Sequence, residues 1–336
     1  MHLSRFPRVR LTHAPTPLEP LTRLSKLLDG PNLYIKRDDC TGLATGGNKT
    51  RKLEFLLGDA LAQGANHIVT QGATQSNHVR QTAAAAALLG LNCTALLEAR
   101  IDDASVEYRN SGNVLLDRLF GCRLEPRPGG LDMNAEIELY ADGLRARGEA
   151  PYTIPGGGSN PIGALGYVVS AQEILQQADD RDIVVDHVVH ATGSTGTQAG
   201  LVAGFHGLNS GIPVLGISVR AERAAQEDKV RQLAQRTLAL LGVHAPLAPA
   251  AVAVNSDYVG AGYGRPTPAM IEAVELLART EGILLDPVYA GKGFAGLIGL
   301  IRKGVFRKGQ NVVFVHTGGA VGLFAYRDTF DPLHAA

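Results

Sequence analysis

The sequence predicts an α/β protein built from two doubly wound, mostly parallel sheets. Short runs rich in β-branched residues alternate along the chain with longer stretches of helical periodicity, a pattern typical of parallel sheets covered by helices. The chain has 336 residues, of which 45% are hydrophobic, and this is enough to bury the cores of two domains. Its 40 glycines gather in clusters, which indicates several tight turns and ligand-contacting loops.

The expected strands are short apolar runs bounded by turn residues. They are 33–36, 67–71, 93–97, 152–154, 187–191, 214–219 and 312–316. The expected helices are the longer periodic stretches between them. They are 76–89, 133–147, 163–177, 196–208, 221–241, 268–280 and 293–302, together with an amphipathic run that follows Lys49. In doubly wound folds ligands bind where loops leave the carboxyl ends of strands, so we expect the chemistry just after these strands.

Composition narrows the class of protein. Lys and Arg together number 32, as do Asp and Glu, and this balance argues against a nucleic-acid partner or a polybasic membrane surface. The three cysteines, Cys40, Cys93 and Cys122, lie far apart in the chain and lack metal-ligand or disulfide-framework spacing. We therefore expect no metal site and reduced thiols. Residues 1–10 have no long apolar core, and no run is long enough to span a bilayer, so we expect a cytoplasmic protein without a membrane partner.

The segment 46–54, Gly-Gly-Asn-Lys-Thr-Arg-Lys-Leu-Glu, places an amine at a glycine-rich turn that enters a helix. Lys49 has two cationic neighbours in the same turn, Arg51 and Lys52. Like charge favours the neutral form of an amine, and a neutral amine can form a Schiff base. The alternative is a solvated basic helix start, and this motif by itself leaves both interpretations open.

Two loops that follow expected strands could bind anions. The loop 72–78 opens a helix, where backbone N–H groups and hydroxyls can hold a carboxylate, although Ser76 or Asn77 could equally be ordinary helix caps. The loop 192–197, Thr-Gly-Ser-Thr-Gly-Thr, alternates glycines and hydroxyls as a phosphate cup requires. It has neither the Walker nor the dinucleotide-binding spacing, so a single phosphate group is the better guest.

Two further loops offer hydroxyls. Tyr289 closes the segment 286–289 and could donate a hydrogen bond or move a proton, although such a tyrosine more often only packs. Thr317 follows the strand 312–316 and could face a cofactor ring atom, or could cap a turn. A phosphate cup, a Schiff-base lysine and a strand-end hydroxyl together fit pyridoxal phosphate better than other cofactors.

Over nearly its whole length the chain resembles the fold-type II branch of pyridoxal-phosphate enzymes that contains 1-aminocyclopropane-1-carboxylate deaminase, D-cysteine desulfhydrase and L-cysteate sulfo-lyase. The motifs that carry the resemblance are 36–39, 46–54, 75–81, 262–264, 286–289 and 316–319. The resemblance implies a tryptophan synthase β-like fold with a small domain over 50–161. It implies a large cofactor-binding domain formed by 1–49 and 162–336, a cofactor in the cleft between the domains, and a homodimer.

The resemblance also implies roles for individual residues. The implied catalytic residues are Lys49, Ser76, Tyr263 and Tyr289, with Lys49 forming the Schiff base and later acting on the Cα proton. Asn77 would hydrogen-bond the cofactor's phenolic oxygen, and Thr317 would face its pyridine nitrogen. The phosphate would lie on Gly193, Ser194, Thr195, Gly196 and Thr197. The amino-acid substrate would contact Ser76, Asn77, His78 and Arg220.

The substrate is expected to be a 3-substituted alanine that undergoes α,β-elimination. The deaminase branch has a glutamate where this chain has Ala290 and lacks the threonine found here as Thr317, so opening of the cyclopropane ring is the less favoured reaction. The segments 40–43, 155–161 and 255–260 look more like the cysteate lyase than the desulfhydrase.

We therefore predict conversion of L-cysteate to pyruvate, sulfite and ammonium. Arg220 or His78 would be the cation that faces the sulfonate, unless Arg220 is an ordinary surface residue. The alternative substrate is D-cysteine, which would give pyruvate, sulfide and ammonium. An alternative of a different class is a non-catalytic amino-acid sensor that has kept the fold.

Overall fold

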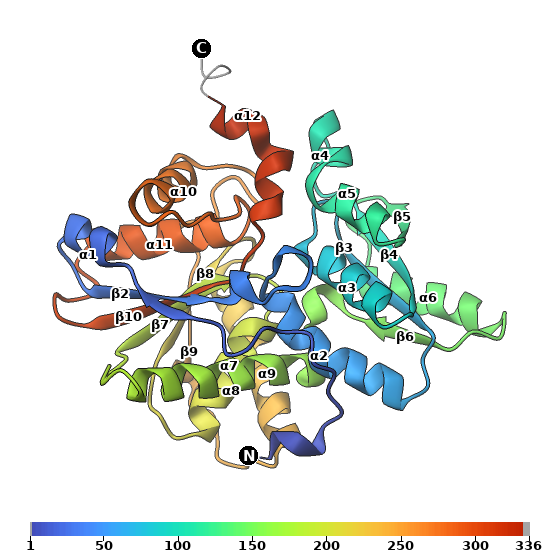
Figure 1. Cartoon of the computed structure of the whole chain (residues 1–336), viewed down its shortest axis with the longest axis horizontal. Coiled ribbons are helices and arrows are strands. Elements are labelled where there is room, and N and C mark those ends of the chain that lie inside the picture. The colour runs from blue at the N-terminus through green and yellow to red at the C-terminus, as the bar shows by residue number, and fades with distance from the viewer. Residues whose placement is uncertain (1, 332–336) are drawn as a thin grey trace.

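The computed structural model describes residues 2–331 and contains two sheets, each with helices on both faces (Figure 1). The larger sheet has six strands in the order β1-β2-β10-β7-β8-β9. Their bounds are β1 Leu18–Pro20, β2 Asn32–Arg37, β10 Asn311–His316, β7 His187–Thr192, β8 Val214–Ser218 and β9 Val252–Asn255. All neighbouring strands are parallel except β1, which pairs antiparallel with β2.

The smaller sheet has four strands in the order β5-β4-β3-β6, all parallel. Their bounds are β5 Arg123–Arg127, β4 Asn92–Glu98, β3 His67–Ala73 and β6 Pro151–Ile154. This sheet lies within the predicted small domain, 50–161, and its separation from the larger sheet is plain in Figure 1. The predicted α/β class with two parallel-sheet units is confirmed, whereas the residue boundaries of the domains stay a prediction.

Most of the helices connect parallel strands as crossovers, whereas α1 joins the antiparallel pair β1 and β2 and α12 follows the last strand. They are α1 Thr22–Leu28, α2 Asn48–Ala62, α3 Asn77–Leu88, α4 Val106–Asn110, α5 Gly112–Leu119, α6 Met133–Arg145, α7 Pro161–Asp179, α8 Gly196–Gly207, α9 Arg223–Leu241, α10 Pro268–Glu281, α11 Ala290–Arg302 and α12 Arg327–Phe330, with a 3₁₀ segment at Ala320–Tyr326. On one face of the larger sheet α7, α8 and α9 bury side chains such as Tyr167 and Phe205. On the other face α10 and α11 bury Met270 and Phe294. Helices α2 and α3 pack on one face of the smaller sheet, and α6 packs on the other.

Each of the predicted strands is present, but three others were not predicted. Strands β1 and β9 have three and four residues, which is too short for a periodic signal. Strand β5 lies at the edge of the smaller sheet and reads Arg-Leu-Glu-Pro-Arg, and a proline is tolerated only at such an edge. All three missed strands lie at sheet edges, whereas only one of the four edge strands, β6, was predicted.

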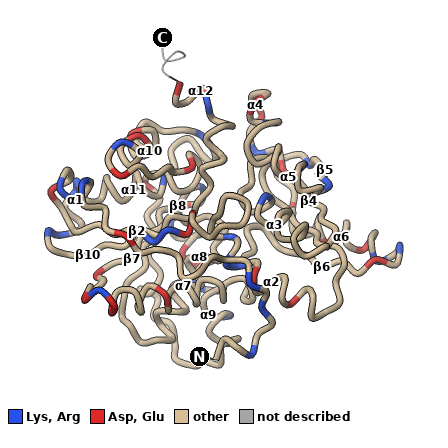
Figure 2. The backbone as a smooth tube through the Cα atoms, in the orientation of Figure 1, with Lys and Arg blue, Asp and Glu red and all other residues tan. Residues whose placement is uncertain are grey.

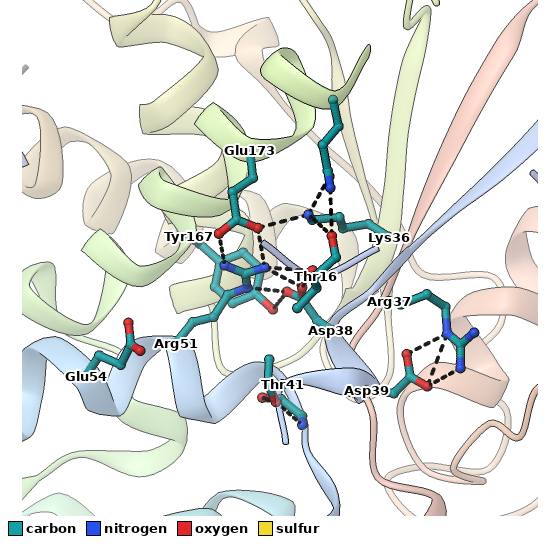
Figure 3. A network of polar contacts seen from close by, with 12 residues as sticks. Thr16, Lys36, Arg37, Asp38, Asp39, Thr41, Arg51, Glu54, Tyr167 and Glu173 are labelled. Atoms are coloured by element: carbon teal, nitrogen blue, oxygen red, sulfur yellow. Dashed lines mark hydrogen bonds and ion pairs between the residues drawn. The ribbon is translucent and has the colours of Figure 1, made fainter. Parts of the chain in front are cut away.

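A buried ion network joins α2 to the larger sheet and to α7 (Figure 3). The Arg51 guanidinium lies 2.8 Å from carboxylate oxygens of both Asp38 and Glu173. Lys36 Nζ donates to Glu173 at 2.9 Å, and Tyr167 Oη donates to Asp38 at 2.6 Å. Because this network holds the helix that begins beside Lys49, it fixes the position of the predicted catalytic amine.

The structure also shows where the three cysteines and the charged residues lie. Cys40, Cys93 and Cys122 are free thiols, but the sulfur atoms of Cys93 and Cys122 lie 3.5 Å apart, so these two residues are not far apart in space. In the view of Figure 2 basic and acidic segments are interspersed over both units, in keeping with the balanced charge. Between residues 2 and 331 no helix is long and apolar enough to cross a membrane.

Candidate active site

A cavity of about 550 Å³ opens where the carboxyl ends of strands from both sheets face each other. The start of α2 and the loops after β3, β7, β8 and β10 contribute to its lining. Lys49, Arg100, Arg220, Lys229 and Arg236 line it, and none of the described lining residues is Asp or Glu. The cavity therefore suits an anionic guest.

Lys49 lies in the first turn of α2 with its amine in this cavity. Its Nζ lies 3.4 Å from Ser194 Oγ and 3.5 Å from the Gly157 carbonyl oxygen, both of which can accept its hydrogen bonds. Burial lowers the pKa of Lys49 to about 8, against the opposing influence of a hydrogen bond with Lys52 and the charge of Asp286. Near neutral pH, a larger fraction of this amine is therefore neutral and nucleophilic than in an exposed lysine.

The direction of this pKa shift was predicted correctly, but its largest cause is burial and not neighbouring charge. Arg51 is paired with Asp38 and Glu173 in the ion network of Figure 3, and its charge is not among the causes that shift the pKa of Lys49. Lys52 does lie beside Lys49, but their hydrogen bond raises the pKa of Lys49. Removal of the amine from water, which sequence spacing cannot report, lowers the pKa instead.

Lys52 is a second amine at this site, and the sequence reasoning treated it only as a charged neighbour. Its side chain is fully buried, and its Nζ donates to the Gly157 carbonyl at 3.0 Å. Burial, followed by the charge of Lys49, lowers its pKa well below the ordinary value. The three-residue spacing of Lys49 and Lys52 was the sequence signal for this second amine, because residues i and i+3 share a helix face.

The predicted phosphate cup closes around the start of α8. Thr195 has a φ of 75°, which turns the chain sharply before the helix begins at Gly196. Asn48 Nδ2 donates to Thr197 Oγ1 at 2.9 Å, and the Gly196 N–H donates to Ser159 Oγ at 3.1 Å. A Cβ added to Gly196 would lie 2.9 Å from Lys52 Nζ, so glycine at this position lets the Lys52 amine approach the backbone at the start of α8. An open helix N-terminus beside two lysines fits a phosphate group.

The loop after β3 carries the predicted substrate contacts. Ser76 is the N-cap of α3, and its Oγ accepts from the Val79 N–H at 3.2 Å. Ser76, Asn77 and His78 all line the cavity, so capping and ligand contact occur at the same helix start. The hydrogen-bond donors of this turn are thus available to a carboxylate.

His78 is a neutral side chain in this site. Its Nε2 lies 2.8 Å from Thr70 Oγ1, and that hydroxyl donates its proton to the Ile154 carbonyl at 2.9 Å. Thr70 must therefore accept from Nε2–H, which leaves His78 Nδ1 as a buried acceptor without a partner among residues 2–331. Burial, followed by the charges of Lys49 and Lys52, lowers the pKa of His78 well below 6.5, which argues against the expected cationic role.

The two predicted tyrosines form a pair. Tyr263 Oη and Tyr289 Oη lie 2.6 Å apart, and the rings meet edge to face with centroids 5.7 Å apart. Burial raises the pKa of both, so both hydroxyls keep their protons near neutral pH. Asp286 positions Tyr289 by accepting from the backbone N–H groups of 288, 289 and 290 at 2.7–3.1 Å. Tyr289 lines the cavity, and Tyr263 lies behind it.

The remaining predicted residues lie on two other loops. Thr317 follows β10 and lines the cavity, as expected for a residue at a strand end. Arg220 follows β8 and is exposed at the cavity rim, so it is both a surface residue and a lining residue. Its guanidinium has no hydrogen bond or ion pair with any other residue between 2 and 331. All the predicted site residues except Gly196 and Tyr263 line this one cavity.

These residues fit pyridoxal phosphate. Lys49 and the cup lie in the same cavity, as one cofactor with an aldehyde and a phosphate requires. Gly157 lets the chain approach closely, because a Cβ there would lie 2.3 Å from Ser194 Oγ and 3.2 Å from Lys49 Nζ. Lys49 would hold the aldehyde carbon, residues 193–197 the phosphate and Thr317 the ring nitrogen.

Comparisons with known proteins agree with this fit. A family model described as pyridoxal-phosphate dependent enzyme matches residues 9–318. The D-cysteine desulfhydrases of Salmonella typhi and Salmonella newport (strain SL254) are each 50% identical to this chain over 325 residues, which cover 97% of this chain and 98% of the relative.

Solved structures extend the comparison to the fold. A crystal structure described as an ACC deaminase homologue superposes with a TM-score of 0.87 at 39% identity and covers 98% of this chain and 99% of that one. O-ureido-L-serine synthase, at 21% identity and a TM-score of 0.66 over 96% of this chain and 95% of that one, shares the fold. The chain therefore belongs to the pyridoxal-phosphate-dependent enzyme family, in its fold-type II branch.

Proposed function

We propose that the protein catalyses α,β-elimination of D-cysteine, giving pyruvate, sulfide and ammonium. The observation that carries the reaction type is the convergence of the Lys49 amine, the phosphate cup and the start of α3 on one cavity. The likeness to D-cysteine desulfhydrases over 97% of the chain supports this substrate over L-cysteate, which the sequence motifs favoured. The neutral state of His78 removes one of the two cations expected to face a sulfonate.

The side chains divide the work as follows. When bound, pyridoxal phosphate supplies the electron sink for the Cα–H bond electrons. Lys49 would hold the cofactor, and its amine would take the Cα proton on Nζ. Ser76 and the first N–H groups of α3 hold the substrate carboxylate. The Cβ–S bond then breaks with its electrons leaving on sulfur, and water converts the remaining enamine to pyruvate and ammonium.

Tyr289 is placed to assist departure of the sulfur. Its hydroxyl lines the cavity, keeps its proton and is backed by Tyr263 at 2.6 Å. A neutral thiol leaves as hydrosulfide, whereas a thiolate would have to leave as the far more basic sulfide dianion. A neutral hydroxyl donor beside the sulfur therefore matches the thiol form of the substrate.

A second candidate substrate, L-cysteate, rests on Arg220. This exposed cation at the cavity rim makes no ion pair with any other described residue, so it is available to a sulfonate.

The test is an assay of cofactor-loaded protein with D-cysteine, L-cysteate and 1-aminocyclopropane-1-carboxylate, in which keto acid, sulfide and sulfite are quantified. Sulfide and pyruvate in equal amounts from D-cysteine, at the highest kcat/KM of the three, is the expected result.

Other products of that assay would contradict the proposal. Sulfite released from L-cysteate at the higher kcat/KM would replace the substrate and assign Arg220 to the sulfonate. A yellow protein whose spectrum changes with amino acids but that yields no keto acid would favour a sensor.

We further propose that the protein is a homodimer located in the cytoplasm. Its small domain would span 50–161, and its large domain would combine 1–49 with 162–336.

The pKa of Lys49 gives a prediction for cofactor capture. Only the neutral amine attacks an aldehyde, so the rate at which apoprotein takes up pyridoxal phosphate should rise with pH and level off above about pH 8. Stopped-flow absorbance of apoprotein mixed with cofactor measures this rate. A rate that does not change between pH 6 and 9 would show that burial in the cavity does not lower the pKa of Lys49 to about 8.

A further inference from the structure

A buried polar cluster lies directly behind Asn77. The Arg80 guanidinium donates from Nη1 to Asn77 Oδ1 at 3.0 Å and to Asn113 Oδ1 at 2.6 Å, and from Nη2 to the Gly46 carbonyl at 2.7 Å. Asn113 Nδ2 also donates to Asn77 Oδ1, at 3.1 Å. An amide oxygen has two lone pairs, so Asn77 Oδ1 is saturated by these two donors.

Saturation of the oxygen fixes which end of the Asn77 amide faces the cavity. Asn77 Nδ2 can only donate, and it makes no hydrogen bond to any residue between 2 and 331. A Cβ added to Gly319 would lie 2.3 Å from this nitrogen, and Gly319 has a φ of +101° that favours glycine. The glycine thus keeps the space beside the Asn77 N–H groups open, next to Thr317.

The cluster is itself held in place by Gln75. Gln75 Oε1 accepts from the Asn113 backbone N–H at 2.9 Å, and its Nε2 donates to the carbonyls of Tyr108 and Ser111 at 2.6 and 2.9 Å. Turning the Asn113 side-chain amide would break its own buried hydrogen bonds with Arg80, Asn77 Oδ1 and the Gln75 carbonyl. Gln75 and Arg80, near the two ends of the motif 75–81, therefore both hold Asn113 in place.

Arg80 brings a positive charge to this cluster. Its side chain is fully buried, and burial lowers its pKa to about 10, opposed by the charges of Asp117 and Asp286. The guanidinium is therefore cationic at neutral pH. A cation on an amide oxygen polarises the amide, so the N–H groups at its other end become stronger donors.

We propose that Arg80 and Asn113 are positioning residues that lock the Asn77 amide with its N–H groups toward the phenolic oxygen of the cofactor and strengthen that hydrogen bond. This inference rests on the proposed cofactor role of Asn77 and goes beyond it, because neither residue lines the cavity. The expected consequence is that the phenolic oxygen of the bound cofactor loses its proton more readily than it would beside an unsupported asparagine.

Arg80→Met tests this through the cofactor itself, without substrate. Without the guanidinium, Asn77 Oδ1 keeps one donor and its amide can rotate. We expect apoprotein of this variant to bind pyridoxal phosphate at least about tenfold more weakly. We also expect the absorption of the loaded protein to move from the visible to the near-ultraviolet band, with the pH of interconversion displaced. Fluorescence or absorbance titration and a spectral pH series measure both quantities.

Two further variants separate positioning from general loosening of the fold. Thr82→Val removes a buried hydroxyl from the same helix, whose bond goes to the His78 carbonyl, and should leave the spectrum and the affinity unchanged. Asn113→Asp is nearly isosteric, keeps the acceptor for Arg80 and replaces the donor to Asn77 by an oxygen, so it should shift the spectrum in the same direction.

The outcomes decide the inference independently of the substrate. If Arg80→Met folds poorly by circular dichroism, Asn113→Asp alone gives the answer. Folded variants with wild-type cofactor affinity and an unshifted pH series would overturn the positioning role, whichever amino acid the enzyme consumes. Spectral shifts in both variants, in a protein that eliminates nothing from D-cysteine, would support the inference and reject the proposed reaction.

Discussion

Replacing Lys49 with alanine should lower kcat for keto-acid formation from D-cysteine by at least about 10⁴-fold, because in the proposed mechanism the same amine holds the cofactor and takes the Cα proton. Lys52, the other amine near the start of α2, is fully buried and does not line the cavity, whereas Lys49 does. The variant should also lose the absorption that arises from covalent attachment of the cofactor. Steady-state kinetics with saturating cofactor, together with the absorption spectrum, measure the two losses.

Lys52→Ala is the matched control for this substitution. It removes an amine one helical turn away and should weaken cofactor binding about tenfold or more, because this amine lies beside Gly196, in the loop where we propose the phosphate binds. It should keep covalent attachment and measurable turnover at saturating cofactor. Near-normal turnover in Lys49→Ala together with loss of turnover in Lys52→Ala would reverse the assignment of the two lysines.

Arg51→Met should destabilise the protein by about 3–5 kcal/mol, the usual consequence of removing one partner from a buried ion pair. Arg51 is 1% exposed, and its loss leaves the carboxylates of Asp38 and Glu173 without their main cation (Figure 3). Because Arg51 holds α2 against α7 and the larger sheet, the loss of stability should be felt at α2, the helix that carries Lys49. Urea unfolding followed by circular dichroism measures the change.

A surface pair provides the comparison for Arg51. Arg302 and Glu272 are 2.6 Å apart, but their side chains are 52% and 49% exposed, so Arg302→Met should cost less than about 1 kcal/mol. Equal unfolding midpoints for the two variants would show that the buried network does not hold α2 in place.

The sequence predicted the sheet cores because buried parallel strands read as compact apolar runs. The same reasoning placed the candidate site at strand ends, and the loops after β3, β7 and β10 do line one cavity, as parallel topology requires. It missed β5, whose charged and proline-containing pattern is permitted only at an edge. Periodicity reports burial, and an edge strand is not fully buried.

Charge states were the part that sequence could not supply. Arg51 is adjacent to Lys49 in the chain, yet its guanidinium belongs to another network. His78 was a candidate cation, but burial between Thr70 and two lysines makes it neutral. Such states depend on which groups share a buried space, and spacing along the chain does not determine that.

The support behind Asn77 was hidden for a related reason. Arg80 and Asn113 are 33 residues apart and meet only because α5 packs against α3. Neither residue lines the cavity, so no motif of ligand-binding residues would include them. Their roles follow from hydrogen bonds whose partners are known only in the folded chain.

The most direct test of the account is to reduce the cofactor-loaded protein with borohydride and locate the modified lysine by peptide mass spectrometry. The cavity geometry predicts one pyridoxyl group, on Lys49, with Lys52 unmodified, and predicts that D-cysteine added before reduction prevents the labelling. A pyridoxyl group on Lys52, or labelling of Lys49 that D-cysteine does not diminish, would contradict the account.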